Sequence, residues 1–369
     1  MGPIQATFVA FSAVLALLCV GCDRPVQSVL VPVAVAAEGT SRVPILVVTT
    51  RRRSSDPAEM FTGERGDQVS YATVTVSIPP DNAREIGKVQ WPVSPPGDPN
   101  RDFVTVSTSY LDKQSFHSTL SAAAKQSGRK NVLVFVHGFN TRFDDAVYRF
   151  AQIMHDSKSP AIPVLFTWPS RGEIKLRAYT YDRESANYSR DALEELLDTL
   201  SSDPSVADVN IVAHSMGNWV TLEALRGRSI RLARAADPHK RTSDKNKPMD
   251  KVKYALLVAP DVDVDVFRQQ IHRMGPNRPT FALFLSQDDK ALALSGEIWG
   301  GIQRMGEIDP NQEPYRSELA RDQIQVYDLT KLRSLGSDAH GRAFDDITTV
   351  VDLIKQRNPE EFRRGAAVN

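Results

Sequence analysis

The stretch Val209-Asn210-Ile211-Val212-Ala213-His214-Ser215-Met216-Gly217 decides how this chain should fold. Its first four residues form a largely β-branched run that is typical of a buried strand, and the residues after Gly217 predict a helix. A serine between such a strand and helix lies in a tight turn, which needs small residues two positions before and after it. Ala213 and Gly217 meet that need. A serine held in this way is exposed at the edge of a sheet as a nucleophile.

The pattern around this stretch predicts an α/β fold. From residue 131 onward, apolar strands alternate with amphipathic helices, which indicates a mostly parallel, doubly wound sheet with helices on both faces. The N-terminal third is β-rich, and Tyr71–Ile78 alternates strictly, so we expect an antiparallel β extension on that side. We expect Arg51-Arg52-Arg53 to lie in a solvated loop. The predicted strands are 44–50, 71–78, 103–109, 132–136, 162–167, 253–258, 281–285 and 324–327, and the main helices are about 142–156, 183–201 and 342–356.

The composition is that of an ordinary globular protein. The chain has 369 residues, 41% hydrophobic and 24% charged, with a formal net charge of zero. A neutral balance argues against nucleic acid as a partner. The chain is long enough to bury a large core.

The N-terminus predicts export. Phe8–Val20 is nearly all apolar and has the length of a signal-peptide core rather than of a membrane span. It is followed by Gly21-Cys22, which resembles a bacterial lipobox, so we expect lipidation at Cys22 and a membrane anchor on the periplasmic side. Cleavage after Ala36, giving a soluble periplasmic or secreted protein, is the alternative.

We therefore expect four regions along the chain. Residues 1–22 form the export signal and 23–42 a tether. Residues 43–357 form the main domain, with a β-rich part at 43–125 and a core at 130–357. Residues 358–369 form a tail.

A serine hydroxyl needs a base, and the base needs an orienting acid. In this kind of sheet the chain order is serine, acid, histidine. Of seven histidines, only His239, His272 and His340 follow Ser215. His340 alone lies after the last predicted strand, between glycines that allow its loop to reach over the sheet. We predict that His340 is the base.

The acid should follow the strand at 281–285, where the sequence offers Asp288 and Asp289. We predict Asp289 as the acid, keep Asp288 as the alternative, and expect the other of the two to cap the helix that begins near Ala291. A rival source of the acid is the run Asp261, Asp263 and Asp265. That run lacks the loop glycine and the final glutamate of a calcium loop, so we favour helix capping there and predict no metal site.

Two backbone amides should stabilise the oxyanion that forms during attack on a carbonyl. One is the amide of Met216. The other is that of Phe139, because His137-Gly138 follows an apolar strand and Gly138 allows close approach of the backbone. Loops that follow parallel strands face the ligand, so we expect Trp168, Tyr181 and His137 to wall the site.

Six segments together resemble a bacterial α/β-hydrolase family of uncharacterised esterase/lipase-like proteins. They are VFVHGFNTRFDDAVYR, LFTWPSRG, YDRESANYS, NIVAHSMGN, APDVDVDVF and SQDDKALALS. The resemblance runs from about Pro44 to Asp346. It implies an α/β-hydrolase fold with a triad of Ser215, Asp289 and His340. It gives the YDRES segment no role, and we expect Asp182, Glu184 and Ser185 to start and cap the following helix.

The leading hypothesis is an exported hydrolase of carboxylic esters that needs no cofactor. Thioesters, amides and membrane lipids are alternative substrates, because the same machinery serves them all. A non-catalytic envelope scaffold on the same fold is the alternative from another class. The physiological substrate, the acyl-chain length and the oligomeric state are not predicted by any motif.

Overall fold

The computed structural model describes residues 26–34, 37–235, 250–276, 278–332 and 339–357. Its centre is a mixed sheet whose strands run in the order β3-β2-β1-β5-β4-β6-β7-β8-β9. The strands are β1 (Ser41–Arg53), β2 (Phe61–Ile78), β3 (Val104–Leu111), β4 (Asn131–Val136), β5 (Ile162–Thr167), β6 (Asp208–His214), β7 (Val252–Val258), β8 (Thr280–Leu285) and β9 (Gln325–Asp328).

The strand directions confirm the predicted architecture. β1 pairs antiparallel with β2, and β2 with β3, which gives the antiparallel extension at one edge. β1 joins β5 in parallel, and every later neighbour pair through to β9 is also parallel. Because the strands from β5 onward run the same way, their carboxyl ends meet at one edge, where the loops that could hold a ligand gather.

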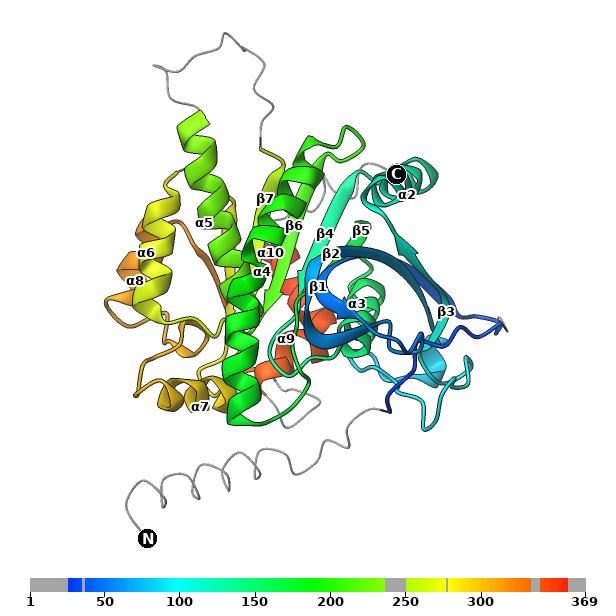
Figure 1. Cartoon of the computed structure of the whole chain (residues 1–369). Helices are drawn as coiled ribbons and strands as arrows, with labels where there is room; N and C mark the ends of the chain where they lie inside the picture. The colour runs from blue at the N-terminus through cyan, green and yellow to red at the C-terminus, as the bar shows by residue number, and fades with distance from the viewer. Residues whose placement is uncertain (1–25, 35–36, 236–249, 277, 333–338, 358–369) are drawn as a thin grey trace.

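Helices cover both faces of the sheet. In Figure 1, α4, α5 and α6 lie in front of the strands, and α9 and α10 lie behind them. Each face has its own apolar cluster, one with Phe116, Leu193 and Leu225 and one with Phe150, Phe284 and Phe344. The helices are α2 (Lys113–Ser127), α3 (Phe143–Asp156), α4 (Leu176–Ser202), α5 (Gly217–Ala235), α6 (Val264–Met274), α7 (Lys290–Ile298), α8 (Tyr315–Arg321), α9 (Arg342–Asp345) and α10 (Ile347–Arg357).

Several local predictions differ from the structure: β2 begins at Phe61, ten residues before the predicted strand, and the predicted helix at 342–356 is divided into α9 and α10. The three arginines expected in a solvated loop end β1, and Arg51 is only 1% exposed. Helix α4 begins at Leu176, seven residues before the predicted start, so Asp182 and Ser185 lie inside it rather than at its cap. The segment expected to be a tether contributes the buried Val29 and Leu30 to the core.

Candidate active site

Ser215 occupies the turn between β6 and α5 in a strained conformation. Its φ is 52°, a left-handed value that residues other than glycine seldom adopt. The turn is fixed on both sides, since Ser215 N donates to Val258 O at 2.9 Å and Asn218 N donates to Ser215 O at 3.1 Å. The Asn218 side chain donates to the same carbonyl at 3.0 Å. The backbone therefore has the geometry of a nucleophile elbow.

Glycines on two elements allow the end of β4 to touch this turn. A Cβ on Gly217 would lie 2.4 Å from His137 O, and a Cβ on Gly138 would lie 2.8 Å from Ser215 Cβ. Neither position has room for a side chain. The predicted partners Gly138 and Ser215 are thus in direct contact, and Phe139 and Met216 follow them in the chain.

His340 and Asp289 form a hydrogen-bonded pair beside the turn. His340 Nδ1 lies 2.7 Å from Asp289 Oδ2, and the Asp289 side chain is fully buried. Burial alone would raise the pKa of Asp289. The charge of His340 and its hydrogen bond outweigh that effect and hold the pKa below its ordinary value. Asp289 is therefore an ionised acceptor that directs the Nδ1 proton of His340 toward itself and leaves the lone pair on Nε2.

The backbone also holds His340 against the residue that precedes Ser215. His214 Nε2 donates to His340 O at 3.1 Å, and the two imidazole rings lie 4.8 Å apart. Burial and, next, the charge that His340 carries when it is protonated lower the pKa of His214 to about 3. His214 is therefore neutral at physiological pH and acts as a fixed support between the elbow and His340.

Asp289 contacts His340, but the expectation that the other aspartate, Asp288, caps the next helix was wrong. Asp289 itself caps α7, since its Oδ1 accepts from Ala291 N at 3.0 Å and Leu292 N at 3.1 Å. Asp288, the expected cap, instead binds both terminal nitrogens of Arg342 at 2.8 and 2.7 Å. This bidentate pair ties the segment that follows His340 to the loop that carries Asp289.

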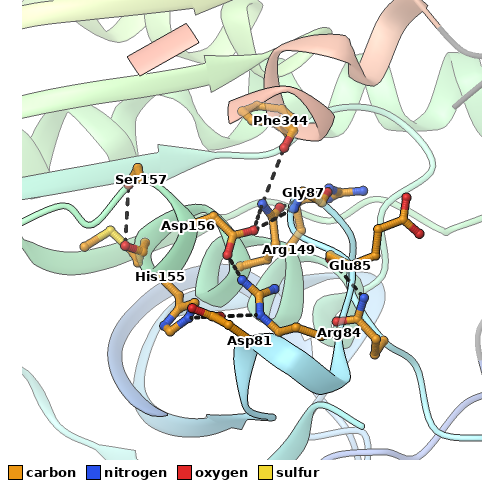
Figure 2. A network of polar contacts seen from close by, with 12 residues as sticks. Asp81, Arg84, Glu85, Gly87, Arg149, His155, Asp156, Ser157 and Phe344 are labelled. Carbon is orange, nitrogen blue, oxygen red and sulfur yellow. Dashed lines mark hydrogen bonds and ion pairs between the residues drawn. The ribbon is translucent and has the colours of Figure 1, made fainter. Parts of the chain in front are cut away.

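A second network of polar contacts holds the segment that follows His340. Figure 2 shows Asp156 at the end of α3, where it forms an ion pair with Arg84 and accepts a hydrogen bond from Gly87 N. Both Arg84 and Gly87 belong to the loop that follows β2. Gln152 donates to Asp156 at 2.8 Å and to Phe344 O at 3.4 Å. Gly87 packs so closely that a Cβ there would lie 2.0 Å from Asp345 O. The N-terminal extension therefore helps to position the short helix that follows His340.

His137 and Trp168 are buried under the loops of the site and do not line its surface, although this had been predicted for them. Both are buried, and their rings stack 4.8 Å apart. His137 Nδ1 donates to Gly138 O at 2.9 Å, while Nε2 lies 2.9 Å from the Thr167 hydroxyl and accepts from Arg51 at 3.3 Å. Burial and the charge of Arg51 keep the pKa of His137 well below its ordinary range. The predicted wall is therefore wrong for these two side chains.

Arg51 is the centre of that support. Its guanidinium donates to Thr167 Oγ1 at 2.8 Å, to Ser170 O at 3.0 Å and to Thr141 O at 2.7 Å. Burial lowers its pKa to about 10, so it stays charged. An arginine from the antiparallel extension thus fixes both the loop after β4 and the loop after β5.

The YDRES segment has a clear structural role. Asp182 is fully buried and accepts from Ser170 Oγ at 2.5 Å and from Arg171 N at 3.0 Å, so α4 holds the WPSRG loop. Tyr181 lies on the outer side of this helix. Its hydroxyl donates to Glu64 at 3.1 Å, and Arg171 stacks on its ring at 3.7 Å. Tyr181 thus contacts the β2 strand and the WPSRG loop.

A polar cluster around Asp261 was not predicted from the sequence. Asp261 Oδ2 accepts from Tyr179 at 2.9 Å, Oδ1 accepts from Ser295 at 2.6 Å, and Arg304 lies 3.3 Å from Oδ1. Its backbone N lies 3.4 Å from Ser215 O, so the cluster adjoins the elbow. The sequence signal that could have indicated it is the acidic residue in Ala259-Pro260-Asp261, directly after β7. As predicted, Asp263 caps a helix, α6.

A family model for alpha/beta hydrolases of unknown function (DUF900) matches residues 112–357. The chain belongs to this family. The match runs from near the start of α2 to the end of α10 and so includes Ser215, Asp289 and His340. No curated protein matches the chain.

Several solved structures are similar to this DUF900 protein at low identity. An inhibited esterase B from Lactobacillus rhamnosis is 11% identical, with 97% of each chain covered and a TM-score of 0.35. A lipase-esterase related protein from Clostridium acetobutylicum is 11% identical over 62% of this chain and 95% of its own, with a TM-score of 0.31. A Listeria innocua gene product is 10% identical over 61% and 92%, with a TM-score of 0.35.

None of the helices in the part of the chain that the structure describes has the length and apolar character needed to cross a bilayer. Over the same residues, His, Cys, Asp and Glu side chains do not gather in groups of three or more that could hold a metal ion. Cys22 lies outside the described residues.

Proposed function

We propose that this protein is a serine hydrolase that cleaves carboxylic esters through Ser215, His340 and Asp289. The observation that carries the proposal is the buried 2.7 Å contact between His340 Nδ1 and Asp289 Oδ2, next to a serine with φ of 52°. A serine is a weak nucleophile unless a base removes its proton, and this pair supplies an oriented base.

The reaction proceeds in two halves. Ser215 Oγ attacks the acyl carbonyl while His340 Nε2 takes its proton, and the amides of Phe139 and Met216 receive the developing oxyanion. The tetrahedral intermediate then expels the alcohol, which takes the proton from His340. Water, deprotonated by His340, attacks the acyl-enzyme and releases the acid, which regenerates Ser215. Asp289 holds the imidazole in one tautomer and stabilises its charged form.

Hydrolysis of p-nitrophenyl esters from acetate to palmitate tests the proposal. We compare the wild-type protein with Ser215→Ala and His340→Ala, and use His272→Ala as a matched control because that side chain is 44% exposed and lies elsewhere. Activity that is abolished in the first two variants and retained in the control supports the triad. A wild-type protein without activity on any ester argues for the scaffold function instead. The chain-length optimum distinguishes an esterase from a lipase.

We further propose that the protein is exported and carries a lipid on Cys22, which would bring the site close to lipid or small-molecule esters at the membrane. The apolar run Phe8–Val20 followed by Gly21-Cys22 supports this proposal. Metabolic labelling with a radioactive fatty acid tests it, with Cys22→Ala and Cys19→Ala as matched variants. Label that persists in Cys22→Ala contradicts it.

A further inference from the structure

Arg183 on α4 is a cation without a counter-ion among the residues that the structure describes. Its Nε is buried and has no hydrogen-bond partner there, and no ion pair joins its guanidinium to a described carboxylate. Other arginines nearby have acidic partners, since Arg171 lies 3.2 Å from Glu64 and Arg190 lies 3.4 Å from Asp191. An unmatched guanidinium that is partly buried attracts an anion.

Two tryptophans hold this guanidinium in place. Arg183 Cζ lies 4.2 Å from the centre of the Trp299 ring and 5.7 Å from that of Trp219. Stacking on an indole face fixes the plane of a guanidinium but supplies no acceptor for its N–H donors. The donors of Arg183 are therefore oriented in advance and remain available for a ligand.

Trp219 connects this cation to the turn that carries the candidate nucleophile. Trp219 is in the first turn of α5, where its N donates to Met216 O at 3.0 Å. Tyr179 lies four residues before Arg183 on the same face of α4. Tyr179 packs against Phe139 with ring centres 5.1 Å apart and accepts from Trp299 Nε1 at 3.2 Å. The Arg183 platform, which we define as Arg183, Trp219 and Trp299, thus contacts Met216 directly and Phe139 through Tyr179.

Two buried acids that adjoin the platform in the fold, Asp261 and Asp182, have partners other than Arg183. The Asp261 carboxylate is already engaged by Tyr179, Ser295 and Arg304. Asp182, the residue before Arg183, accepts from Ser170 and Arg171 on another side of α4. Neither carboxylate therefore compensates the positive charge of Arg183.

We propose that the Arg183 platform binds a carboxylate or phosphate group of the substrate, so that the enzyme prefers esters that carry a negative charge. The inference rests on the proposed function. Arginine binds both anions with two parallel hydrogen bonds, and the flanking indoles cover the rest of the guanidinium. Arg183 is then a specificity-determining residue that touches the substrate away from the scissile bond.

Matched ester pairs test the inference with the full-length protein. One pair is p-nitrophenyl hemiadipate and p-nitrophenyl hexanoate, with the charge on the acyl side. A second is p-(butyryloxy)benzoate and its methyl ester, with the charge on the alcohol side. A third is a monoacylglycerol phosphate and the uncharged monoacylglycerol, which separates a phosphate from a carboxylate.

In at least one pair the wild type should prefer the anionic member. Arg183→Met should lower kcat/KM for that member about 10- to 100-fold, mainly through KM, and should change the neutral member less than about twofold. Arg177→Met is the control, because it removes an exposed charge from a different face of the same helix. Equal losses on both members, or no loss on either, would overturn the inference.

A binding measurement separates this inference from the proposed reaction. Ser215→Ala protein is titrated with adipate and with inorganic phosphate while tryptophan fluorescence is followed, since both platform indoles touch Arg183. We expect a saturable change with one of these anions that Arg183→Met abolishes. If this change occurs but no ester is hydrolysed by the wild type, the proposed reaction fails and the anion site stands. If esters are hydrolysed without charge preference and neither anion binds, the anion site alone fails.

Discussion

Replacing Asp289 by Asn separates the two contacts that this carboxylate makes. Asn retains an oxygen that can accept from Ala291 N and Leu292 N, at present 3.0 and 3.1 Å from Oδ1. Its amide nitrogen, however, donates where Oδ2 accepts from His340 at 2.7 Å. His340 must then lose this contact or move its proton from Nδ1 to Nε2. In the second state Nε2 cannot take the proton of Ser215.

The expected effects differ sharply between catalysis and stability. Loss of the orienting acid from a serine triad lowers kcat about 10⁴-fold, or about 5.5 kcal/mol in activation free energy. Asp289→Asn keeps a side-chain oxygen at the N-cap of α7. Through the cap, this substitution should therefore change the unfolding free energy by only a few tenths of a kcal/mol, about the difference between Asp and Asn caps. Asp289→Ala loses the cap as well and should be less stable by a further amount of about 1–2 kcal/mol.

The assay combines kcat for p-nitrophenyl butyrate with urea unfolding of the same preparations. Asp288→Asn is the control, because it removes a carboxylate that pairs with Arg342 and is itself 49% exposed. We expect that variant to retain kcat within about tenfold, since a half-exposed ion pair contributes about 1 kcal/mol or less. A kcat of Asp289→Asn within tenfold of wild type would contradict this role of Asp289, and so would an equal loss of kcat in Asp288→Asn.

Three further predictions concern the supports of the site. Gly138→Ala places a Cβ 2.8 Å from Ser215 Cβ and should lower kcat about 100-fold or more by displacing the oxyanion loop; unchanged kcat contradicts the contact. Gly87→Ala at φ +87° would put a Cβ 2.0 Å from Asp345 O, and should reduce both the melting temperature and kcat, with a stability loss of about 1–3 kcal/mol. His214 has a pKa of about 3 when folded against 6.5 ordinarily, so its stabilising effect is complete above pH 6.5 and is lost as the pH falls toward 3. The unfolding free energy, measured in urea, should therefore fall with decreasing pH between these values, and His214→Gln should reduce that slope by up to about 1.4 kcal/mol per pH unit. An unchanged slope in the variant would show that His214 does not cause it.

Much of the fold was predictable because its signals are local. The apolar runs that became β4, β5 and β8 have the periodicity and length of buried parallel strands. The strict alternation of Tyr71–Ile78 predicted a strand that belongs to the antiparallel part. The ends of helices were less predictable where polar residues are buried. In α4, for example, the first turns contain no apolar stripe of their own.

Burial of Arg51 could not be predicted from neighbouring residues. Three consecutive arginines ordinarily indicate solvent, and the acceptors that make burial of Arg51 possible come from loops far away in the chain, at Ser170 and Thr141. A buried charge is tolerated only when such partners converge on it. The same reason explains why Trp168 and His137 were misplaced, since their position follows from packing beneath Arg51.

The candidate triad was predictable because chain order restricts the choice. Only one histidine follows the last strand, and the loop between β8 and α7 contains two carboxylates, Asp288 and Asp289. The double role of Asp289 was not predictable, because a cap and an orienting acid have the same local sequence. The Arg183 platform was also not predictable, since it forms only where α4, α5 and the turn after α7 meet.

The central claim is that Ser215 is an activated nucleophile. A fluorophosphonate probe reacts with such serines and not with ordinary hydroxyls, so we would label the full-length protein and locate the adduct by peptide mass spectrometry. We expect one adduct per chain on Ser215, which is absent in Ser215→Ala and forms much more slowly in His340→Ala. An unlabelled wild-type protein, or equal labelling of wild type and Ser215→Ala, would contradict it.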